Sequence, residues 1–366
     1  MFKRVSANIN LENLIGNYKY LRSVTNENSE VAAVVKADAY GHGADRVANA
    51  LQAAGVGTFC VASLEEAIAL RNAGIYRDVL ILGRVFRQDV HTACEYGFIL
   101  TVTGYDMAKA LADASYSTLR VHIKLDTGMT RNGIYCHSEE DVKPVCDECE
   151  MIHAIPKICP EGIYTHFCVA DSDREFTKKQ FDTFMSVCDG LARRGINCGK
   201  RHCCSSAGIL FYPEYHLDMV RAGIALYGYS PSAAIVPELH YCMTLESRID
   251  YIREVKQGDA VGYGRTYVAS RDMKVAVISI GYGDGFSRLL SNKACLTINS
   301  HSVPVVGNIC MDACMADITG VDCHEGDRVV IFGTTGMGAD KMADTIGTIS
   351  YEILCDVGKR VDRIYL

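Results

Sequence analysis

The chain has 366 residues, of which 49% are hydrophobic and 22% charged, values typical of a globular protein too long for one small core. A net charge of −7 argues against a nucleic-acid partner, and no apolar stretch approaches the roughly 18 residues that predict a membrane span. Residues Met1–Ser6 lack the apolar core of a signal peptide, so we expect a cytoplasmic protein.

Strand and helix signals alternate from the N-terminus to about residue 227. Apolar residues at helical spacing from Leu11 to Leu21 predict an amphipathic helix, and the run Val31–Val35 predicts a buried strand. Further strands are expected at 58–62, 79–82, 98–102, 119–125, 163–167, 201–205 and 219–227, with helices between them and a long helix near 176–192. About eight strands separated by helices predict parallel pairing in a closed (β/α)8 barrel, with the active site at the carboxyl ends of the strands.

The pattern changes near residue 235. Short strands between glycine and polar turns are expected at 251–255, 259–261, 275–280, 296–298, 303–306 and 328–332, followed by a helix near 342–354 and a closing strand at 361–366. We therefore predict an α/β protein with two domains, a barrel over residues 1–235 and a mostly-β domain over residues 236–366.

Lys36 follows the first barrel strand and opens the sequence Lys-Ala-Asp-Ala-Tyr-Gly-His-Gly. Burial at the carboxyl end of a core strand lowers the pKa of a lysine and makes its amine nucleophilic, as a Schiff base with a carbonyl cofactor requires. The alternative is a lysine that extends from the strand end into solvent. The glycine-rich sequence favours the first interpretation, because it predicts a tight polar turn built around an anion.

The 17 cysteines are odd in number, and many stand inside apolar runs. This pattern predicts reduced thiols that act as small hydrophobic side chains rather than disulfides. Cys146 and Cys149, with His153 four residues on, could hold zinc, but no second cysteine pair has the same spacing. We therefore expect no metal site.

Five further segments place polar or cationic residues at expected strand ends or in turns: Lys124–Gly133, Tyr164–Phe167, Ser205–Gly208, Val220–Gly228 and Gly262–Tyr267. Ser205 and Ser206 can offer hydroxyl and N–H groups to a phosphate at a helix start. Arg221 stands alone in an apolar run, where the alternative is an ordinary surface arginine after a strand.

Together with the sequence Val-Lys-Ala-Asp-Ala-Tyr-Gly-His-Gly, these segments resemble the alanine racemase family of pyridoxal-phosphate enzymes over nearly the whole chain. The resemblance implies a (β/α)8 barrel with an additional β domain, in agreement with the elements expected above. It also implies pyridoxal 5'-phosphate as the cofactor and racemisation of L-alanine to D-alanine, which supplies D-alanine for peptidoglycan.

The resemblance assigns catalysis to two residues. Lys36 matches the Schiff-base lysine, which also serves as the base on one face of the substrate α-carbon, and Tyr263 matches the tyrosine that serves the opposite face. Two bases are needed because one base would mostly return the proton to the face that it left. A tyrosine, with a reference pKa of about 10, needs a stabilised phenolate for this task, and His166 and Arg265 are the candidates for providing it.

The same resemblance assigns the binding residues. Arg221 and His166 match cofactor-binding residues, with Arg221 facing the pyridine nitrogen as a donor that keeps this nitrogen unprotonated. The phosphate site comprises Tyr40, Ser206, Gly223, Ile224 and Tyr351. Arg131 matches the arginine that binds the substrate carboxylate, and Lys124 matches a lysine that is often carbamylated in the family. An unmodified Lys124 would repel Arg131, so one of these two charges needs to be neutralised.

Met311 and Asp312 match a substrate-side loop that, in the family, reaches the cofactor from the partner subunit together with the tyrosine matching Tyr263. A homodimer with shared active sites is therefore implied. Tyr282 matches a tyrosine of the access corridor, or packs at a strand end. The chain departs from the family pattern at Thr130 and Asn132, and at Ser205, where asparagine is usual.

Three alternatives remain open. A serine racemase of the same family, of the glycopeptide-resistance type, is the nearest one, and the aromatic ring of Tyr351 favours the smaller alanine with modest discrimination. A non-catalytic pyridoxal-phosphate-binding barrel would lack the second domain and Tyr263. A decarboxylase of basic amino acids would carry a carboxylate where Arg221 stands.

Overall fold

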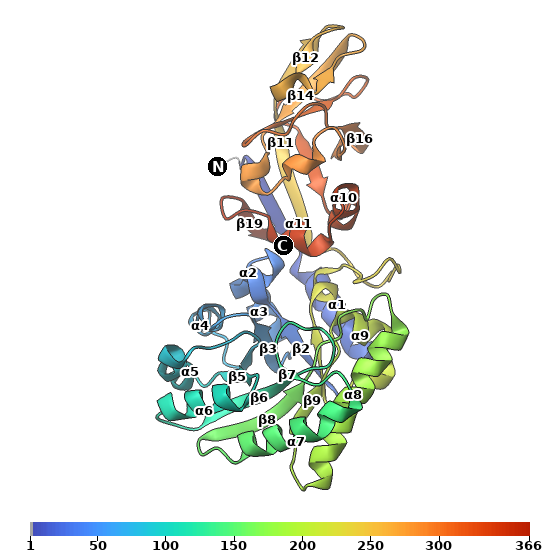
Figure 1. The fold of residues 1–366 in the computed structure, drawn as a ribbon. Coiled ribbons are helices and arrows are strands. Elements are labelled where there is room, and N and C mark those ends of the chain that lie inside the picture. The colour runs from blue at the N-terminus through green and yellow to red at the C-terminus, as the bar shows by residue number, and fades with distance from the viewer. Residues whose placement is uncertain (1–2) are drawn as a thin grey trace.

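The computed structural model describes residues 3–366, which form two domains placed end to end (Figure 1). One domain is built from parallel strands surrounded by helices, and the other mainly from antiparallel strands. Within residues 3–366, no helix combines the length and apolar character needed to cross a membrane.

The parallel strands pair in the order β10-β2-β3-β4-β5-β6-β8-β9. Their bounds are β2 (Glu30–Val34), β3 (Thr58–Val61), β4 (Asp78–Ile81), β5 (Ile99–Val102), β6 (Leu119–Asp126), β8 (Ile158–Tyr164), β9 (Lys200–His202) and β10 (Met219–Ala222), with the short β7 (Ile134–Tyr135) beside β6. The N–H of Arg221, on β10, donates to the carbonyl oxygen of Cys204, just after β9, at 3.0 Å. This hydrogen bond connects the first and the last strand of the order. The parallel sheet is thus nearly closed, and the expected (β/α)8 barrel is confirmed.

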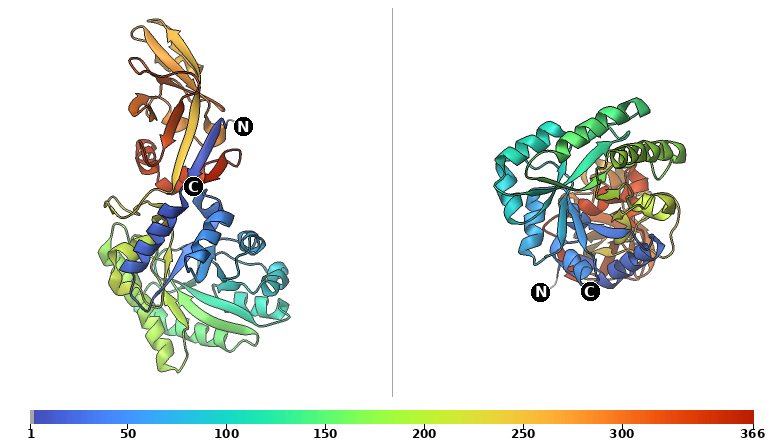
Figure 2. Two further views of the ribbon diagram at one scale, coloured as in Figure 1. Left: turned by 180° about the vertical axis from the view of Figure 1, so that it is seen from behind. Right: turned by 90° about the horizontal axis from the view of Figure 1, so that it is seen from below.

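Helices surround this sheet, as the view along the barrel shows (Figure 2). They are α1 (Leu11–Val24), α3 (Ala44–Ala53), α4 (Leu64–Asn72), α5 (Val90–Glu95), α6 (Tyr105–Ala114), α7 (Glu139–His153), α8 (Arg174–Arg193) and α9 (Ser206–Phe211). Cys146 and Cys149 are buried on α7, and the Cys146 thiol contacts the Val187 carbonyl oxygen of α8 at 3.6 Å. Cys146 therefore lies in the packing between α7 and α8.

The second domain has the strand order β16-β15-β18-β11-β1-β19, with β14 paired to both β11 and β17. The strands are β1 (Val5–Ile9), β11 (Met243–Val255), β12 (Ala260–Val261), β13 (Tyr267–Val268), β14 (Met273–Ile278), β15 (Cys295–Ile298), β16 (His301–Pro304), β17 (Cys314–Asp317), β18 (Arg328–Phe332) and β19 (Asp362–Tyr365). Strand β1 pairs antiparallel with β11 and parallel with β19, so both ends of the described chain lie in this sheet. Strand β1 therefore belongs to the second sheet, although it lies within residues 1–235, the range expected for the barrel.

The bounds of several predicted elements differ from the structure, and two of these differences change the type or number of elements. The single helix expected near 342–354 is divided into α10 (Ala339–Ile346) and α11 (Ser350–Cys355), because Gly347 adopts a left-handed conformation with φ +76°. The strand expected over 219–227 ends at Ala222, and the short 3-10 helix η3 (Ile224–Tyr227) follows it.

Candidate active site

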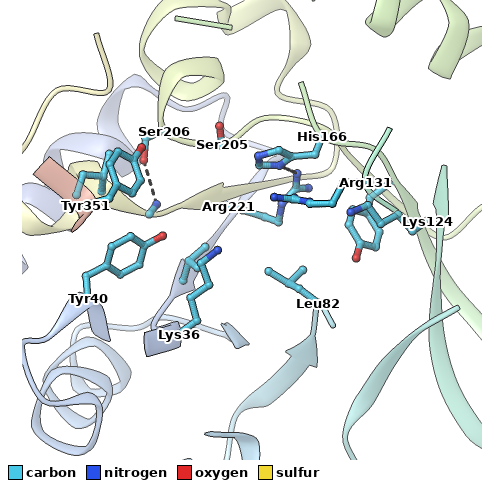
Figure 3. A pocket seen from close by; sticks show the side chains of 14 residues that line it. Lys36, Tyr40, Leu82, Lys124, Arg131, His166, Ser205, Ser206, Arg221 and Tyr351 are labelled. Carbon is cyan, nitrogen blue, oxygen red and sulfur yellow. Dashed lines mark hydrogen bonds between the residues drawn. The ribbon is translucent and has the colours of Figure 1, made fainter. Parts of the chain in front are cut away.

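A pocket opens at the carboxyl ends of the barrel strands, where side chains from most of the strand ends converge (Figure 3). It is lined by Val34, Lys36, Tyr40, Leu82, Lys124, Arg131, Tyr164, His166, Ser205, Ser206, Arg221, Gly223, Ile224 and Tyr351. The lining includes two lysines and two arginines but no carboxylate, so the pocket suits an anionic ligand.

Directly after β2, the segment labelled α2 (Lys36–Tyr40) contains a left-handed turn. Four residues in succession, Ala37 to Tyr40, have φ between 51° and 54°, although none of them is glycine. This conformation costs roughly 1–2 kcal/mol per residue, so tertiary contacts must hold it in place. The carboxylate of Glu66 provides one such contact, since it accepts hydrogen bonds from the N–H groups of Ala37 and Ala62, both at 2.7 Å.

The turn places Lys36 and Tyr40 on the pocket wall (Figure 3). Burial lowers the pKa of Lys36, and the positive charge of Arg131 lowers it further, while Glu66 acts in the opposite direction. A lowered pKa increases the fraction of neutral amine, which is the nucleophilic form, in agreement with the sequence-based expectation.

The opposite wall is built for close approach to an anion. The hydroxyl oxygen of Ser206 accepts hydrogen bonds from the N–H groups of Gly223 at 3.0 Å and Ala225 at 3.2 Å, which leaves its own proton free to donate. A Cβ atom at Gly223 would lie 2.9 Å from the Tyr40 hydroxyl oxygen, so a side chain there would displace that hydroxyl. The ring of Tyr351, on α11, lies 5.8 Å from that of Tyr40. These residues bring three hydroxyl groups to one end of the pocket.

Arg221 occupies the middle of the pocket and is 3% exposed. Its guanidinium donates to the Thr165 carbonyl oxygen at 2.9 Å, to Nδ1 of His166 at 3.1 Å, and to Nδ1 of His202. Because an arginine cannot accept a hydrogen bond, both histidines must present an unprotonated Nδ1 to it. Burial, followed by the charge of Arg221, lowers the pKa values of both histidines well below 6.5.

The hydrogen-bond chain continues behind Arg221 into the barrel. Nε2 of His202 lies 2.9 Å from Nδ1 of His122, and the His202 ring stacks on Tyr164 with ring centroids 4.6 Å apart. Since His202 accepts at Nδ1, it must donate from Nε2, which makes His122 an acceptor at its own Nδ1. One direction of donation therefore runs from Arg221 through His202 to His122.

Lys124 and Arg131 both line the pocket, as expected from the position of Lys124 near the carboxyl end of β6 and of Arg131 in the segment that follows it. Burial and the charge of Arg131 lower the pKa of Lys124 to about 7. The Lys124 ammonium donates to the side-chain oxygen of Asn132. The nearby carboxylate of Asp126 accepts hydrogen bonds from the N–H groups of residues 128–130, at 2.9–3.1 Å. The repulsion expected between Lys124 and Arg131 is thus relieved by a lowered pKa and by a neutral amide.

Tyr263, Met311 and Asp312 do not line this pocket. They lie in the second domain, where the Tyr263 side chain is 73% exposed and that of Met311 is 53% exposed. The side-chain N–H of Asn308 donates to the Tyr263 carbonyl oxygen at 2.8 Å and connects the two segments. Within one chain, the structure therefore brings together the predicted residues of the barrel and Tyr351, but not these three.

Sequence reasoning missed several residues that shape the site. Glu66 supports the turn after Lys36, and His202 and His122 continue the hydrogen bonds of Arg221, but none stands in a recognisable motif. Asn132 was singled out only as a departure from the family pattern. A polar residue inside a predicted buried strand, such as His122, is the one signal that could have identified this chain of histidines.

Comparison with known proteins identifies relatives along the whole chain. The family description "Alanine racemase, N-terminal domain" matches residues 9–231, and "Alanine racemase, C-terminal domain" matches residues 242–365. The alanine racemase of Desulforamulus reducens is 40% identical over the full length of both chains. Alanine racemase 1 of Clostridium acetobutylicum is 39% identical and is aligned over 100% of this chain and 97% of its own.

Solved structures agree with these matches. An alanine racemase from Clostridium difficile superimposes with a TM-score of 0.92 at 35% identity, covering 100% of this chain and 96% of the other. The alanine racemase of Bacillus anthracis, solved with bound L-Ala-P, gives a TM-score of 0.92 at 31% identity with the same coverage.

Proposed function

The chain belongs to the alanine racemase family, and on that premise we propose that it interconverts L- and D-alanine with pyridoxal 5'-phosphate as its cofactor, supplying D-alanine for peptidoglycan. The observation that carries this proposal is the pocket at the barrel mouth. It combines an amine of lowered pKa, three hydroxyl groups at one end, and an arginine that can only donate hydrogen bonds.

The residues of the pocket fit this cofactor. Tyr40, Ser206, Tyr351 and the backbone at Gly223 and Ile224 would hold the phosphate, and Lys36 would bind the aldehyde through its amine. When bound, pyridoxal phosphate acidifies the α-proton of an amino acid by accepting electrons from the α-carbon. Arg221 would lie against the ring nitrogen, and because it cannot release a proton, it would leave that nitrogen neutral and weaken the electron withdrawal.

Proton exchange is assigned to two groups. The Nζ atom of Lys36 takes or returns the α-proton on one face of the substrate, and the phenolic oxygen of Tyr263 does so on the other. His166 and Arg265 are proposed to stabilise the phenolate. Arg131 orients the substrate through its carboxylate, with Lys124 beside it, whose lowered pKa provides the neutral amine that carbamylation requires.

We propose a homodimer in which Tyr263, Met311 and Asp312 complete the pocket of the partner subunit. Their exposure on the second domain and their absence from the pocket of their own chain support this arrangement. We also propose that the enzyme acts in the cytoplasm, because all 17 cysteines are free thiols, as is usual in a reducing compartment.

The function is tested by a chiral assay of the purified protein with L-alanine and with L-serine, each with and without added pyridoxal phosphate. We expect cofactor-dependent formation of D-alanine that exceeds the formation of D-serine. Equal rates on the two substrates would favour the serine racemase, and no turnover of either would contradict the proposal.

The Lys36→Ala variant provides the matching control. We expect it to lose both racemisation and the visible absorbance of the bound cofactor, because the substitution removes the amine proposed to bind the aldehyde. An absorbance band that persists unchanged would show that a different amine, such as Lys124, binds the aldehyde.

A further inference from the structure

Asp284 is a fully buried carboxylate in the second domain, and the reaction proposed above does not use it. It ends the short 3-10 helix η5 (Tyr282–Asp284), in the sequence Gly-Tyr-Gly-Asp-Gly. A carboxylate without solvent requires strong partners, because desolvation otherwise destabilises its charge.

The partners of Asp284 come from both ends of the chain. The Arg360 guanidinium donates from Nε to Oδ1 at 2.7 Å, and the Arg4 guanidinium donates to the same oxygen. The other oxygen, Oδ2, accepts the N–H of Gly281 at 3.0 Å. Asp284 therefore fixes the directions of two arginines and closes the turn that carries Tyr282.

Both arginines also donate to one loop, and Arg4 donates in addition to the Ser279 carbonyl oxygen at 2.7 Å. Arg360 forms an ion pair with Asp312 at 2.9 Å and donates to the Met311 carbonyl oxygen at 3.2 Å. Arg4 donates to the Asp312 carbonyl oxygen at 3.1 Å. The loop of Met311 and Asp312 is thus held by two cations that Asp284 orients.

The turn itself also binds the same loop. The N–H groups of Tyr282 and Gly283 donate to the carbonyl oxygens of Cys310 and Met311 at 3.0 and 2.9 Å. A Cβ atom at Gly281 or Gly283 would collide with this loop or with Arg360, so the two glycines permit the close approach. The loop continues to Asn308, which binds the backbone of Tyr263.

We propose that Asp284 is a positioning residue that holds the loop of Met311 and Asp312, and through it Tyr263, in the geometry needed by the active site of the partner subunit. The inference rests on the proposed function with shared sites. Asp284 touches neither substrate nor cofactor in this arrangement. It acts through Arg4 and Arg360, so its removal affects the site to which its own chain lends the loop.

Hybrid dimers test this assignment. In the first hybrid, one subunit carries both Lys36→Ala and Asp284→Asn, and its partner is unmodified. The only site with a Lys36 then borrows its loop from the altered chain. In the second hybrid the two substitutions are on different subunits, and the site with a Lys36 borrows an intact loop.

We expect the racemase activity of the second hybrid to match that of a dimer in which Lys36→Ala on one subunit is the only substitution. The first hybrid should be about 10- to 100-fold slower, because misplacing a reacting group by about 1 Å has an effect of this size. Cofactor absorbance should be the same in both hybrids. Equal activity of the two hybrids would overturn the proposal, since general destabilisation acts regardless of which chain carries the substitution.

Two further variants keep the result interpretable. Glu246→Gln removes another buried carboxylate of the second domain, whose hydrogen bonds go to Asn8 and Arg328, and should give two equally active hybrids. If Asp284→Asn does not fold, Arg360→Gln leaves the Arg4–Asp284 pair intact and should reproduce the difference between the hybrids.

Tyr263→Phe in the same two hybrids separates the two proposals. A difference between hybrids for Tyr263→Phe but not for Asp284→Asn would overturn only the role of Asp284. No difference for either variant would overturn the shared active site together with this inference.

Discussion

Three histidines, His42, His122 and His202, are buried in the barrel domain, and the Nδ1 atom of each has a defined hydrogen-bond partner. His42 lies 2.9 Å from the Tyr40 carbonyl oxygen through Nδ1, which must therefore carry the proton. Burial lowers the pKa of His42 to about 4 and that of His122 to about 3. These imidazoles are neutral at physiological pH, and their tautomers are determined by their neighbours.

Their lowered pKa values predict destabilisation in acid. Below about pH 6.5 the unfolded chain binds protons at these histidines, whereas the native chain does so at His42 only near pH 4. The free energy of unfolding should therefore decrease as the pH falls through this interval, by up to about 1.4 kcal/mol per pH unit for each histidine. Urea unfolding at several pH values between about 7.5 and 5 measures this slope.

The His42→Gln variant is the control for that prediction. Because glutamine does not titrate, the variant should have a shallower dependence of the unfolding midpoint on pH than the unmodified protein. The same midpoint at both ends of the interval in the unmodified protein would contradict the prediction.

At this scale the sequence indicated that Lys36 and Arg221 lie at the strand ends where the pocket forms, because a lone cation beside an apolar run is a local signal. It did not predict Asn132 as the partner of Lys124, since that contact depends on how the segment after β6 turns back toward the strand. The tautomers of His122 and His202 follow from an arginine on another strand, and no local pattern contains that information.

The turn α2 shows how a strained element is held by its neighbours. Four non-glycine residues in a left-handed conformation are unfavourable in isolation, and several tertiary contacts oppose this tendency. Gly41 ends the turn at φ +80° and packs against the backbone of α11 at Leu354. This contact brings Tyr40, on the turn, close to Tyr351, on α11.

Replacement of Gly41 should therefore uncouple the two sides of the phosphate site. In Gly41→Ala the new Cβ atom would overlap the Leu354 carbonyl oxygen in addition to straining the backbone. We expect a loss of more than about 1 kcal/mol in unfolding free energy and weaker binding of pyridoxal phosphate. Thermal unfolding and a titration with the cofactor measure the two effects.

Gly74→Ala is the matched control, because Gly74 has a similar φ of +89° but no neighbouring atom within 4 Å of the added Cβ. It should share the backbone strain and leave cofactor affinity unchanged. If the Gly41→Ala variant bound the cofactor as tightly as the unmodified protein, the packing of α11 on the turn would not determine the geometry of the site.

The whole molecule distributes the predicted catalytic groups over two regions. The pocket with Lys36 lies at the barrel mouth, whereas Tyr263 is exposed on the second domain of the same chain. The pocket of one subunit therefore holds every group proposed to bind the cofactor, but only one of the two groups proposed to exchange protons.

This division predicts different effects of dilution on binding and on catalysis. On dilution below the dissociation constant of the dimer, the specific racemase activity should fall, while the cofactor absorbance per subunit should remain. Sedimentation at the same concentrations identifies the dimer and the monomer. Undiminished specific activity in a range where only monomers sediment would contradict the shared site.

What the sequence determined alone is the succession of barrel strands and the residues that follow them. Apolar runs identify strands locally, and parallel strands place their carboxyl ends at one edge, so Lys36, His166 and Arg221 were expected to meet there. The tertiary structure decided what depends on contacts between distant segments. These are the pairing of β1 with β11, the left-handed turn, and the hydrogen bonds by which Asp284 orients Arg4 and Arg360. The local sequence does not identify such contacts, because each residue is of a common type and its role depends on a partner that is distant along the chain.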